Sequence, residues 1–420
     1  MKLRTKSTLF LILSCALLFQ GLAAAWQSPL LPSWRKANSA SKAKIPQFIL
    51  DTRHPWLTAH AGELANLDDP HAVFCTTLKD LIASSNHDPE CGHDWHLTGL
   101  DIPRDLFHSL EIDNNRVGVD RYGWPNARNR FLEMKNCPRA LEEVRELKVD
   151  VYSHKAESVL PPDDLPGLFA EVMGEMKGLK KLDWTIRGWE ENQAFRDEFH
   201  RQGVELRSVE ELRANMYASW IREATPRLRM LEATSDSSHF SEPEDWGEFP
   251  LVWLESLDKL RELKSLNLGD IRWDKQVEMT ELIPKVLPNL EELWVGPLTH
   301  GHLAPPGEAL RNMTKTFASL HKLKKLHLPY SANLHLDFDG GPWCGNAYDG
   351  DGGARLWRQV RLDDIDATER AGSIVQEEIP NLKGVGVGDF YGNFTFDAQG
   401  TRTIDWPWTG RLEEWLSETN

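Results

Sequence analysis

A repeated segment of the form Leu-x-x-Leu-x-Leu constrains the fold of this chain more than any other feature of its sequence. Apolar residues take the first, fourth and sixth positions, as in Leu179-Lys-Lys-Leu182-Asp-Trp184 and Leu290-Glu-Glu-Leu293-Trp-Val295. The last three residues of each copy alternate in the way a short strand does. The pattern therefore predicts neighbouring parallel strands of one sheet at residues 147–149, 182–184, 231–233, 266–268, 293–295, 326–328 and 385–387.

Each copy follows a stretch with helical periodicity. Apolar residues recur at intervals of three and four in residues 165–176, 251–257, 279–283, 310–317 and 374–379. Pro288 and Pro380 interrupt the helical pattern just before two of the strands. A helix and a strand repeated in this order leave an apolar face on each unit, so neighbouring units must stack. The intervals from 184 to 231 and from 328 to 385 are longer than the others and leave room for an insertion or a degraded copy.

These motifs resemble the leucine-rich-repeat family, especially the long, helix-bearing repeats of ribonuclease-inhibitor and F-box-associated repeat proteins. The resemblance implies an α/β leucine-rich-repeat solenoid, a horseshoe with parallel strands on its concave face and an N-terminal cap. The sequence departs from the family pattern at the position where the repeats usually carry an asparagine, so no internal asparagine ladder is expected. No F-box precedes the repeats. The positions of that asparagine hold Tyr152, Arg187, Asp236, Ile271, Leu298, Ser331 and Phe390.

The sequence divides into five parts on this interpretation. They are a signal peptide (1–25), an N-terminal cap region (26–135), leucine-rich repeats (136–330), a Gly/Asp-rich insertion loop (331–372), and the last repeat with a C-terminal cap (373–420). The strand-like segments 97–102 and 110–112 are assigned to the N-terminal cap.

The first residues have the three parts of a secretory signal peptide. Lys2, Arg4 and Lys6 precede the apolar run 9–19, and small residues follow at 23–25. The apolar run is short for a membrane span, so cleavage is favoured over an uncleaved anchor. We expect a secreted, extracellular protein with no membrane segment after cleavage.

Four cysteines remain after removal of the signal peptide, an even number that suggests two disulfides in a secreted chain. Cys75 and Cys91 are separated by a polar turn and are expected to pair, and a bond between Cys137 and Cys344 is the weaker expectation. Asn312 and Asn393 lie in Asn-x-Thr acceptors for N-glycosylation.

Two segments have residues that could bind metal. His87, Cys91, His93 and His96 offer zinc ligands without a complete four-ligand spacing. Aspartates at 337, 339, 349 and 351 put oxygen ligands on a glycine-rich stretch but do not complete a calcium loop. We expect neither a metal nor a cofactor. Cys91 in the first segment is expected to form a disulfide, and the second segment is expected to be a solvated loop.

Charge and motifs limit the function. A net charge of −16 argues against broad nucleic-acid binding, which depends on a basic surface. The nucleophile-elbow, zincin, phosphate-loop and dinucleotide motifs are all missing from the sequence. We therefore expect no enzymatic activity.

The outward positions of the predicted strands form the candidate binding site. Trp184 and Trp253 lie in core patterns, whereas Trp294 lies between Leu293 and Val295 and should point out of the sheet. The predicted concave-face residues are Lys148, Asp183, Glu232, Asn267, Trp294 and His327, with Gly386 at the same position in the last copy. The other interpretation of Trp294 is an ordinary exposed side chain covered by the insertion.

The function predicted from these features is non-catalytic binding of a protein partner through the concave face. The alternative is a secreted glycan-binding protein in which Trp294 and other exposed aromatic residues stack on sugar rings. A hydrolase built on the caps is the third class, and it has the least support in the sequence.

Overall fold

The fold is described from a computed structural model of the chain. The structure describes residues 53–60, 95–97, 100–113, 124–135, 137–151, 160–186, 188–234, 249–269, 275–298, 305–342 and 344–418. The predicted signal peptide, the predicted Cys75–Cys91 disulfide and most of the histidine-rich segment near Cys91 lie outside these residues.

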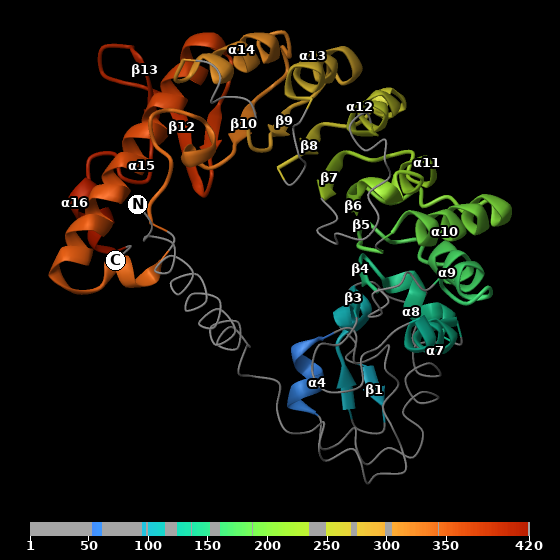
Figure 1. Cartoon of the computed structure of the whole chain (residues 1–420). Coiled ribbons are helices and arrows are strands. Elements are labelled where there is room, and N and C mark those ends of the chain that lie inside the picture. Colours follow the sequence, from blue (N-terminus) through green and yellow to red (C-terminus); the bar gives the residue numbers. More distant parts are fainter. Residues whose placement is uncertain are drawn as a thin grey trace, which may run out of the picture.

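One long sheet forms the inner side of an arc (Figure 1). Eleven strands follow one another in chain order, parallel from β3 to β11 and antiparallel from β11 to β13. The strands are β3 (Ser109–Asp113), β4 (Glu146–Asp150), β5 (Lys181–Trp184), β6 (Glu211–Asn215), β7 (Met230–Thr234), β8 (Ser265–Asn267), β9 (Glu292–Trp294), β10 (Lys325–Leu328), β11 (Gly384–Val387), β12 (Phe390–Phe396) and β13 (Arg402–Asp405). A separate antiparallel pair is formed by β1 (Trp95–Leu97) and β2 (Leu100–Ile102).

Helices lie along the outer side of the arc (Figure 1) and connect successive parallel strands. They are α7 (Trp124–Lys135), α8 (Pro138–Glu143), α9 (Leu165–Gly174), α10 (Trp189–Gln202), α11 (Ile221–Ala224), α12 (Phe249–Glu255), α13 (Gln276–Val286), α14 (Glu308–Phe317) and α15 (Gly350–Glu378). Two further helices do not connect parallel strands: α4 (Pro55–Ala59) precedes β1, and α16 (Leu412–Glu418) follows β13. Short 3-10 helices are η2 (Arg104–Phe107), η3 (Met216–Ala218), η4 (Ser256–Lys259), η6 (Ser331–Asn333) and η7 (Gly345–Tyr348). This is an α/β solenoid in which the strands of a mostly parallel sheet alternate with helices.

The repeated leucines form the core because the strands stack in register. Leu147 is paired with Leu182, Leu266 with Leu293 and Leu293 with Leu326. The side chains of these residues are at most 1% exposed. Alternation along each strand turns the residue between two such positions toward the concave side. The leucine spacing thus fixes which residues face the hollow of the arc.

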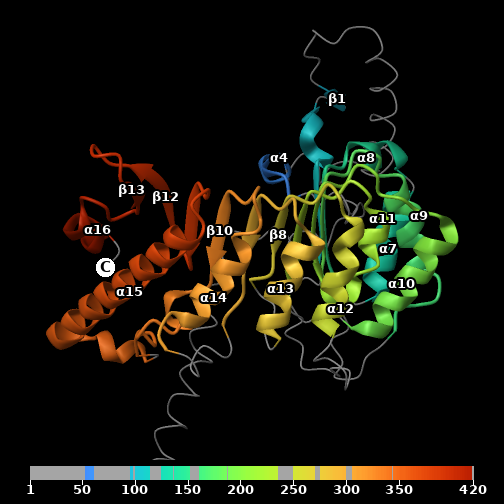
Figure 2. The ribbon, with the colours of Figure 1, turned by 90° about the horizontal axis from the view of Figure 1, so that it is seen from above.

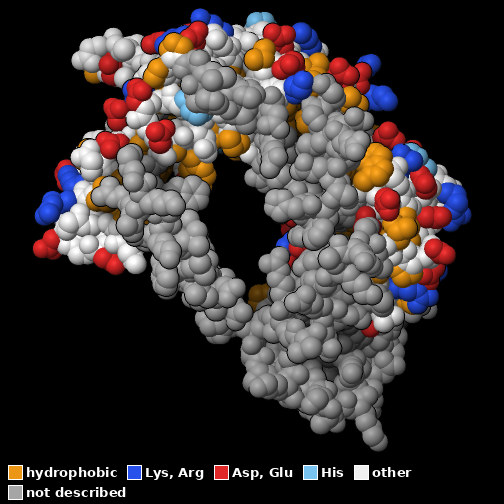
Figure 3. All heavy atoms as spheres, in the orientation of Figure 1, with side chains coloured by type: hydrophobic (Ala, Val, Ile, Leu, Met, Phe, Trp, Pro, Cys, Tyr) orange, Lys and Arg blue, Asp and Glu red, His pale blue; other side chains and the backbone are white. Residues whose placement is uncertain are grey.

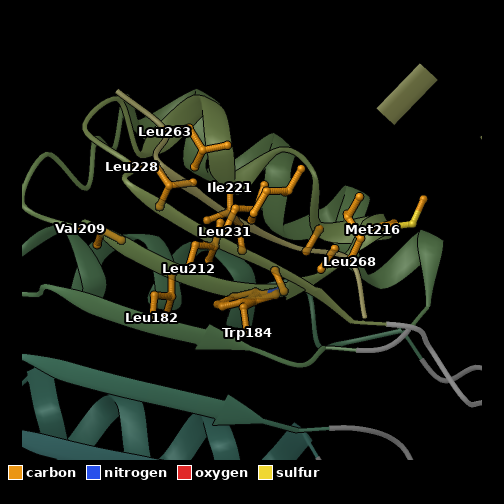
Figure 4. Close-up of a cluster of buried hydrophobic side chains, with 14 of the residues drawn as sticks. Leu182, Trp184, Val209, Leu212, Met216, Ile221, Leu228, Leu231, Leu263 and Leu268 are labelled. Atoms are coloured by element: carbon orange, nitrogen blue, oxygen red, sulfur yellow. The ribbon is translucent and has the colours of Figure 1, made fainter. Parts of the chain in front are cut away.

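Trp184 of β5 is buried in the core (Figure 4). Its strand partner on β6 is the small Ala214, so the large indole ring fills the space beside it. Its ring is surrounded edge-on by other aromatic rings from the helices, and its indole N–H donates to the Asn192 side chain at 3.2 Å. Asn192 is completely buried and donates in turn to the carbonyls of Ile186 and Gly188. Asn215 of β6 also donates to the Ile186 carbonyl, so two buried asparagines satisfy the backbone of this turn.

All seven predicted strand segments belong to the one sheet, which confirms the repeat interpretation. Among the parallel strands, the sequence missed β6, which lies between β5 and β7, and it also missed the antiparallel β12 and β13. The missed copy of the repeat is β6. Its core residues are Val209, Leu212 and Ala214. The small Ala214 hides the repeat pattern, and it fits because the bulky Trp184 occupies the neighbouring position. The long interval before residue 231 is thus a degraded copy.

Residues 110–112, predicted to lie in the N-terminal cap region, form an edge strand of the main sheet. They lie in β3, which pairs in parallel with β4 and is part of the main sheet. Leu110 and Ile112 are buried in line with Leu147 and Val149, so they continue the repeat core. Among the residues that the structure describes, the main sheet begins at Ser109.

The prediction of a loop over residues 331–372 is wrong from Gly350 onward. The 29-residue helix α15 begins at Gly350 and runs to the last repeat (Figure 2). Ile365, Ala371 and Val375 are buried along it at helical spacing. The glycines that suggested a loop lie before this helix or in its first turn, and packing of the later turns stabilises the helix.

The predicted bond between Cys137 and Cys344 does not form. Cys344 has a free, exposed thiol, whereas Cys137 is buried and disulfide-bonded. The two cysteines therefore differ in environment, and Cys344 alone among the described cysteines is available to solvent reagents.

Candidate functional site

A single row of side chains crosses the concave face at the register position between the core leucines. The row is continuous because each residue is the strand partner of the next. From β3 to β12 it reads Glu111, Lys148, Asp183, Arg213, Glu232, Asn267, Trp294, His327, Gly386 and Tyr391. We call this set the concave row. It contains the six predicted site residues and adds Glu111, Arg213 and Tyr391.

The first half of the concave row is charged and paired within the chain. The Lys148 ammonium lies 2.6 Å from the Glu111 carboxylate. Arg213 lies between two carboxylates, 3.1 Å from Asp183 and 2.8 Å from Glu232. Burial alone would lower the pKa of Arg213, but the hydrogen bonds and charges of Glu232 and Asp183 together raise it. Alternating charges on neighbouring strands thus neutralise one another.

Asn267 separates this charged half from the aromatic half. Its side-chain oxygen accepts a hydrogen bond from the backbone N–H of Gly269 at 2.8 Å. The amide is therefore used to hold the turn after β8. This residue occupies the predicted position, but its oxygen has a structural role.

The second half of the concave row is aromatic. The ring of Trp294 stacks on that of His327 with centroids 4.1 Å apart and an interplanar angle of 9°. The His327 ring lies 5.6 Å from that of Tyr391 at 26°. The three rings form a platform across β9, β10 and β12, which we call the aromatic platform.

Two glycines of β11 make room for the aromatic platform. A Cβ at Gly386 would lie 2.5 Å from the His327 ring nitrogen Nδ1. A Cβ at Gly384 would lie 2.0 Å from the Tyr391 hydroxyl. Side chains do not tolerate such distances, so the rings lie flat over β11 only because it carries glycine at both outward positions.

Glu292 is the acid beside the aromatic platform. Its carboxylate lies 3.1 Å from His327 Nε2 and 3.3 Å from the Lys325 ammonium. Burial lowers the pKa of His327, and the hydrogen bond and charge of Glu292 oppose this effect. Burial likewise raises the pKa of Tyr391. Both rings are therefore held in their neutral forms at neutral pH.

The structure brings together some of the predicted residues and separates others. Trp294 and His327 are in ring contact, and Arg213 links Asp183 with Glu232. Sequence reasoning missed Arg213 because it lies in the unrecognised copy at β6. It missed Tyr391 because β12 runs antiparallel and lies outside the repeat period. Only the register of the folded sheet places that ring beside His327.

The aspartate-rich segment and the two sequon asparagines lie on the surface among the described residues. Asp337, Asp339, Asp349 and Asp351 are all exposed, and Asp337 pairs with Arg370. In the part of the chain that the structure describes, no three His, Cys, Asp or Glu side chains gather as a metal site would require. Both sequon asparagines are exposed, Asn312 on α14 and Asn393 on β12.

A hollow of about 670 Å³ lies between α9 and the segment after α10. Lysine, arginine and glutamate side chains line it, and its lining contains neither histidine nor cysteine. It therefore offers no nucleophile paired with a histidine base. Acidic and basic side chains are also interspersed over the outer helical surface (Figure 3).

Comparisons with known proteins add little to this description. No protein-family model matches the chain, and no curated protein is similar to it. The crystal structure of a TLR13–ssRNA13 complex is similar over 47% of this chain and 27% of that chain, with 12% identity and a TM-score of 0.26. The chain thus spans about a quarter of that protein, and the fold assignment rests on the sheet register given above. Within the described residues, the helices are too short or too polar to cross a membrane.

Proposed function

We propose that this chain is a secreted, non-catalytic binding protein that holds a protein partner on its concave face. The stacked pair Trp294 and His327 carries the proposal. Protein interfaces are typically anchored by aromatic side chains held in a fixed position and surrounded by polar residues. The aromatic platform has this composition, with Glu292 and Lys325 beside it and the charged half of the concave row next to it.

The size of the face also favours a macromolecular partner. Strands lie about 4.8 Å apart, so the concave row from β3 to β11 extends over about 38 Å. A stable protein interface covers about 800 Å² on each side, which a surface of this length can supply. A site for a small ligand would instead be an enclosed cavity that buries most of the ligand.

Internal pairing of the charged residues supports binding without catalysis. Arg213, Asp183 and Glu232 already satisfy one another, so they provide a polar surface with fixed charges and no reactive group. Such pairs contribute more to partner selection and association rate than to affinity. One ring face of Trp294 is covered by His327, which leaves less of it for the sugar stacking that a glycan-binding protein would need.

Site-specific photocrosslinking tests the proposal. A photoreactive residue at Lys325, beside the aromatic platform, should capture a protein from extracellular fluid, whereas the same group at the exposed Val277 of α13 should not. The captured protein would then be purified and titrated against the wild type and Trp294→Ala. Loss of affinity in the variant supports the proposal, and equal affinity rejects the concave face as the site.

Two further measurements address the remaining parts of the proposal. Expression with the native N-terminus should deliver the chain to the medium, with an N-terminus near residue 26. An array of neutral glycans should give no binding that depends on Trp294. Retention inside the cell would reject secretion, and Trp294-dependent glycan binding would reject the protein partner.

A further inference from the structure

A second row of side chains lies at the rim of the sheet, at the position just before each of the parallel strands from β4 to β11. Its backbone groups continue the sheet ladder, since each N–H donates to the carbonyl of the preceding member. In order, the members are Arg145, Lys180, Glu210, Arg229, Lys264, Glu291, Lys324 and Lys383. We call this set the rim row. Six of its members are basic and two are acidic, although the whole chain has a net charge of −16.

The cations of the rim row occur as three pairs of neighbours. Arg145 is next to Lys180, Arg229 next to Lys264, and Lys324 next to Lys383, with backbone N···O distances of 2.7–2.8 Å within each pair. Like charges on directly adjacent strands are destabilising. A bound anion between the two members of a pair would relieve this repulsion.

Acidic residues separate the cation pairs and partly neutralise them. The Glu210 carboxylate lies 2.7 Å from Lys180 and 3.4 Å from Arg229. Glu291 accepts hydrogen bonds from Lys264 and Lys324, which lower its pKa to about 2. Each acid is shared between two cations, so the row keeps an excess of positive charge.

The basic side chains are accessible. Lys180, Arg229 and Lys264 are 54–58% exposed, and Lys383 is exposed and has no carboxylate of the described residues within ion-pair distance. Arg145 is the exception, because its guanidinium also donates to the backbone carbonyls of Glu142 and Val144. The second and third cation pairs are therefore the better-exposed part of the row.

We propose that the rim row binds a linear sulfated polysaccharide, with sulfate groups seated between the members of each cation pair. This site is separate from the concave row and does not depend on the proposed protein partner. Successive cation pairs are three strands apart, about 14 Å, so the row matches a polymer whose anionic groups are clustered at intervals.

The chemistry of the rim row disfavours the other linear polyanions. A nucleic-acid strand carries a phosphate about every 3.4 Å, which would place phosphates against Glu210 and Glu291. Binding of single strands also uses aromatic side chains to stack the bases, and the rim row has none. An extended acidic peptide would seek backbone hydrogen bonds, but the N–H groups of the row are already used in the ladder.

Size-defined heparin oligosaccharides are the probe for this site. At 0.15 M salt the full chain should bind a sulfated dodecasaccharide, with affinity that falls as salt is raised. A desulfated dodecasaccharide, an oligonucleotide and a polyglutamate of similar length should bind at least tenfold more weakly. Equal binding of the oligonucleotide or of polyglutamate would overturn the assignment to a sulfated polysaccharide.

Paired neutralisation locates the site. Arg229→Gln/Lys264→Gln and Lys324→Gln/Lys383→Gln should each weaken binding roughly 2- to 30-fold, because each double variant removes two exposed positive charges from the site. The control is Lys285→Gln/Lys315→Gln, which makes the same change in net charge with exposed lysines of α13 and α14. An equal loss of affinity in the control would show a non-specific charge effect and reject the rim row.

Glu291→Gln gives a result of opposite sign. It removes the acid between two cation pairs and releases Lys264 and Lys324, so binding should become roughly 2- to 5-fold tighter. A melting curve checks that each variant is folded. Weaker binding by folded Glu291→Gln would contradict the proposal, because it would mean that the acid itself contacts the ligand.

Discussion

The rings of Trp294 and His327, one repeat apart, lie 4.1 Å from each other and almost parallel. Strand register places them together, since His327 on β10 is the direct partner of Trp294 on β9. The aromatic platform is therefore a property of two adjacent repeats. An insertion or deletion that shifted either strand by one residue would turn its ring into the core.

Truncation of Trp294 should cost little stability in comparison with its neighbour Leu293. Trp294→Ala removes a stacking contact worth about 0.5–1.5 kcal/mol at a partly exposed position. Leu293→Ala opens a cavity in a completely buried column and should cost about 2–5 kcal/mol. Urea denaturation of both variants measures the difference. Similar losses would mean that Trp294 belongs to the core.

Alanine at Gly386 should displace the His327 ring. The added Cβ would lie 2.5 Å from Nδ1, so the imidazole must leave the stack and become more exposed. Because burial lowers the pKa of His327, we expect that pKa to rise toward its ordinary value in Gly386→Ala. An NMR titration measures it, with the His327 signal assigned from His327→Gln.

Gly345→Ala is the matched control for this substitution. A Cβ at Gly345 meets no atom within 4 Å, so the His327 titration should not change. An unchanged His327 pKa in Gly386→Ala would contradict the close packing of the ring on β11.

Acid should destabilise the fold through His327. A histidine whose folded pKa is depressed contributes stability that is present above its unfolded pKa, about 6.5, and is lost as the pH falls through the folded value. The free energy of unfolding should therefore decrease below about pH 6.5 more steeply in the wild type than in His327→Gln. Parallel pH profiles would show that burial does not depress the pKa in solution.

Replacement of Asn192 should be costly despite its polar character. Asn192→Ala leaves the buried Trp184 indole N–H without this partner, at about 1–3 kcal/mol for an unsatisfied group, whereas the Ile186 carbonyl keeps a hydrogen bond from Asn215. The exposed Asn312→Ala on α14 should change stability by less than about 0.5 kcal/mol. Thermal unfolding compares the two, and a neutral Asn192→Ala would contradict its role at this turn.

The alternation of apolar residues was enough to predict most of the sheet. Leu182, Leu266, Leu293 and Leu326 are inward at the positions that the repeat predicted, so Trp294 and His327 point outward from the strands. This part of the fold is local, because side-chain direction within a strand depends only on position along it. The parallel order then follows from the helix between successive strands.

Only the tertiary structure decided which residues meet across strands. It paired Arg213 with Asp183 and Glu232, placed Tyr391 beside His327, and used the small Ala214 opposite Trp184. It also made residues 350–378 a helix, since burial of Ile365 and Val375 outweighs the glycines of its first turn. The sequence by itself determined the repeating strands and their two faces. Contacts between distant segments, and the volume each must fill, decided the site, because neither is present in the local pattern of any one segment.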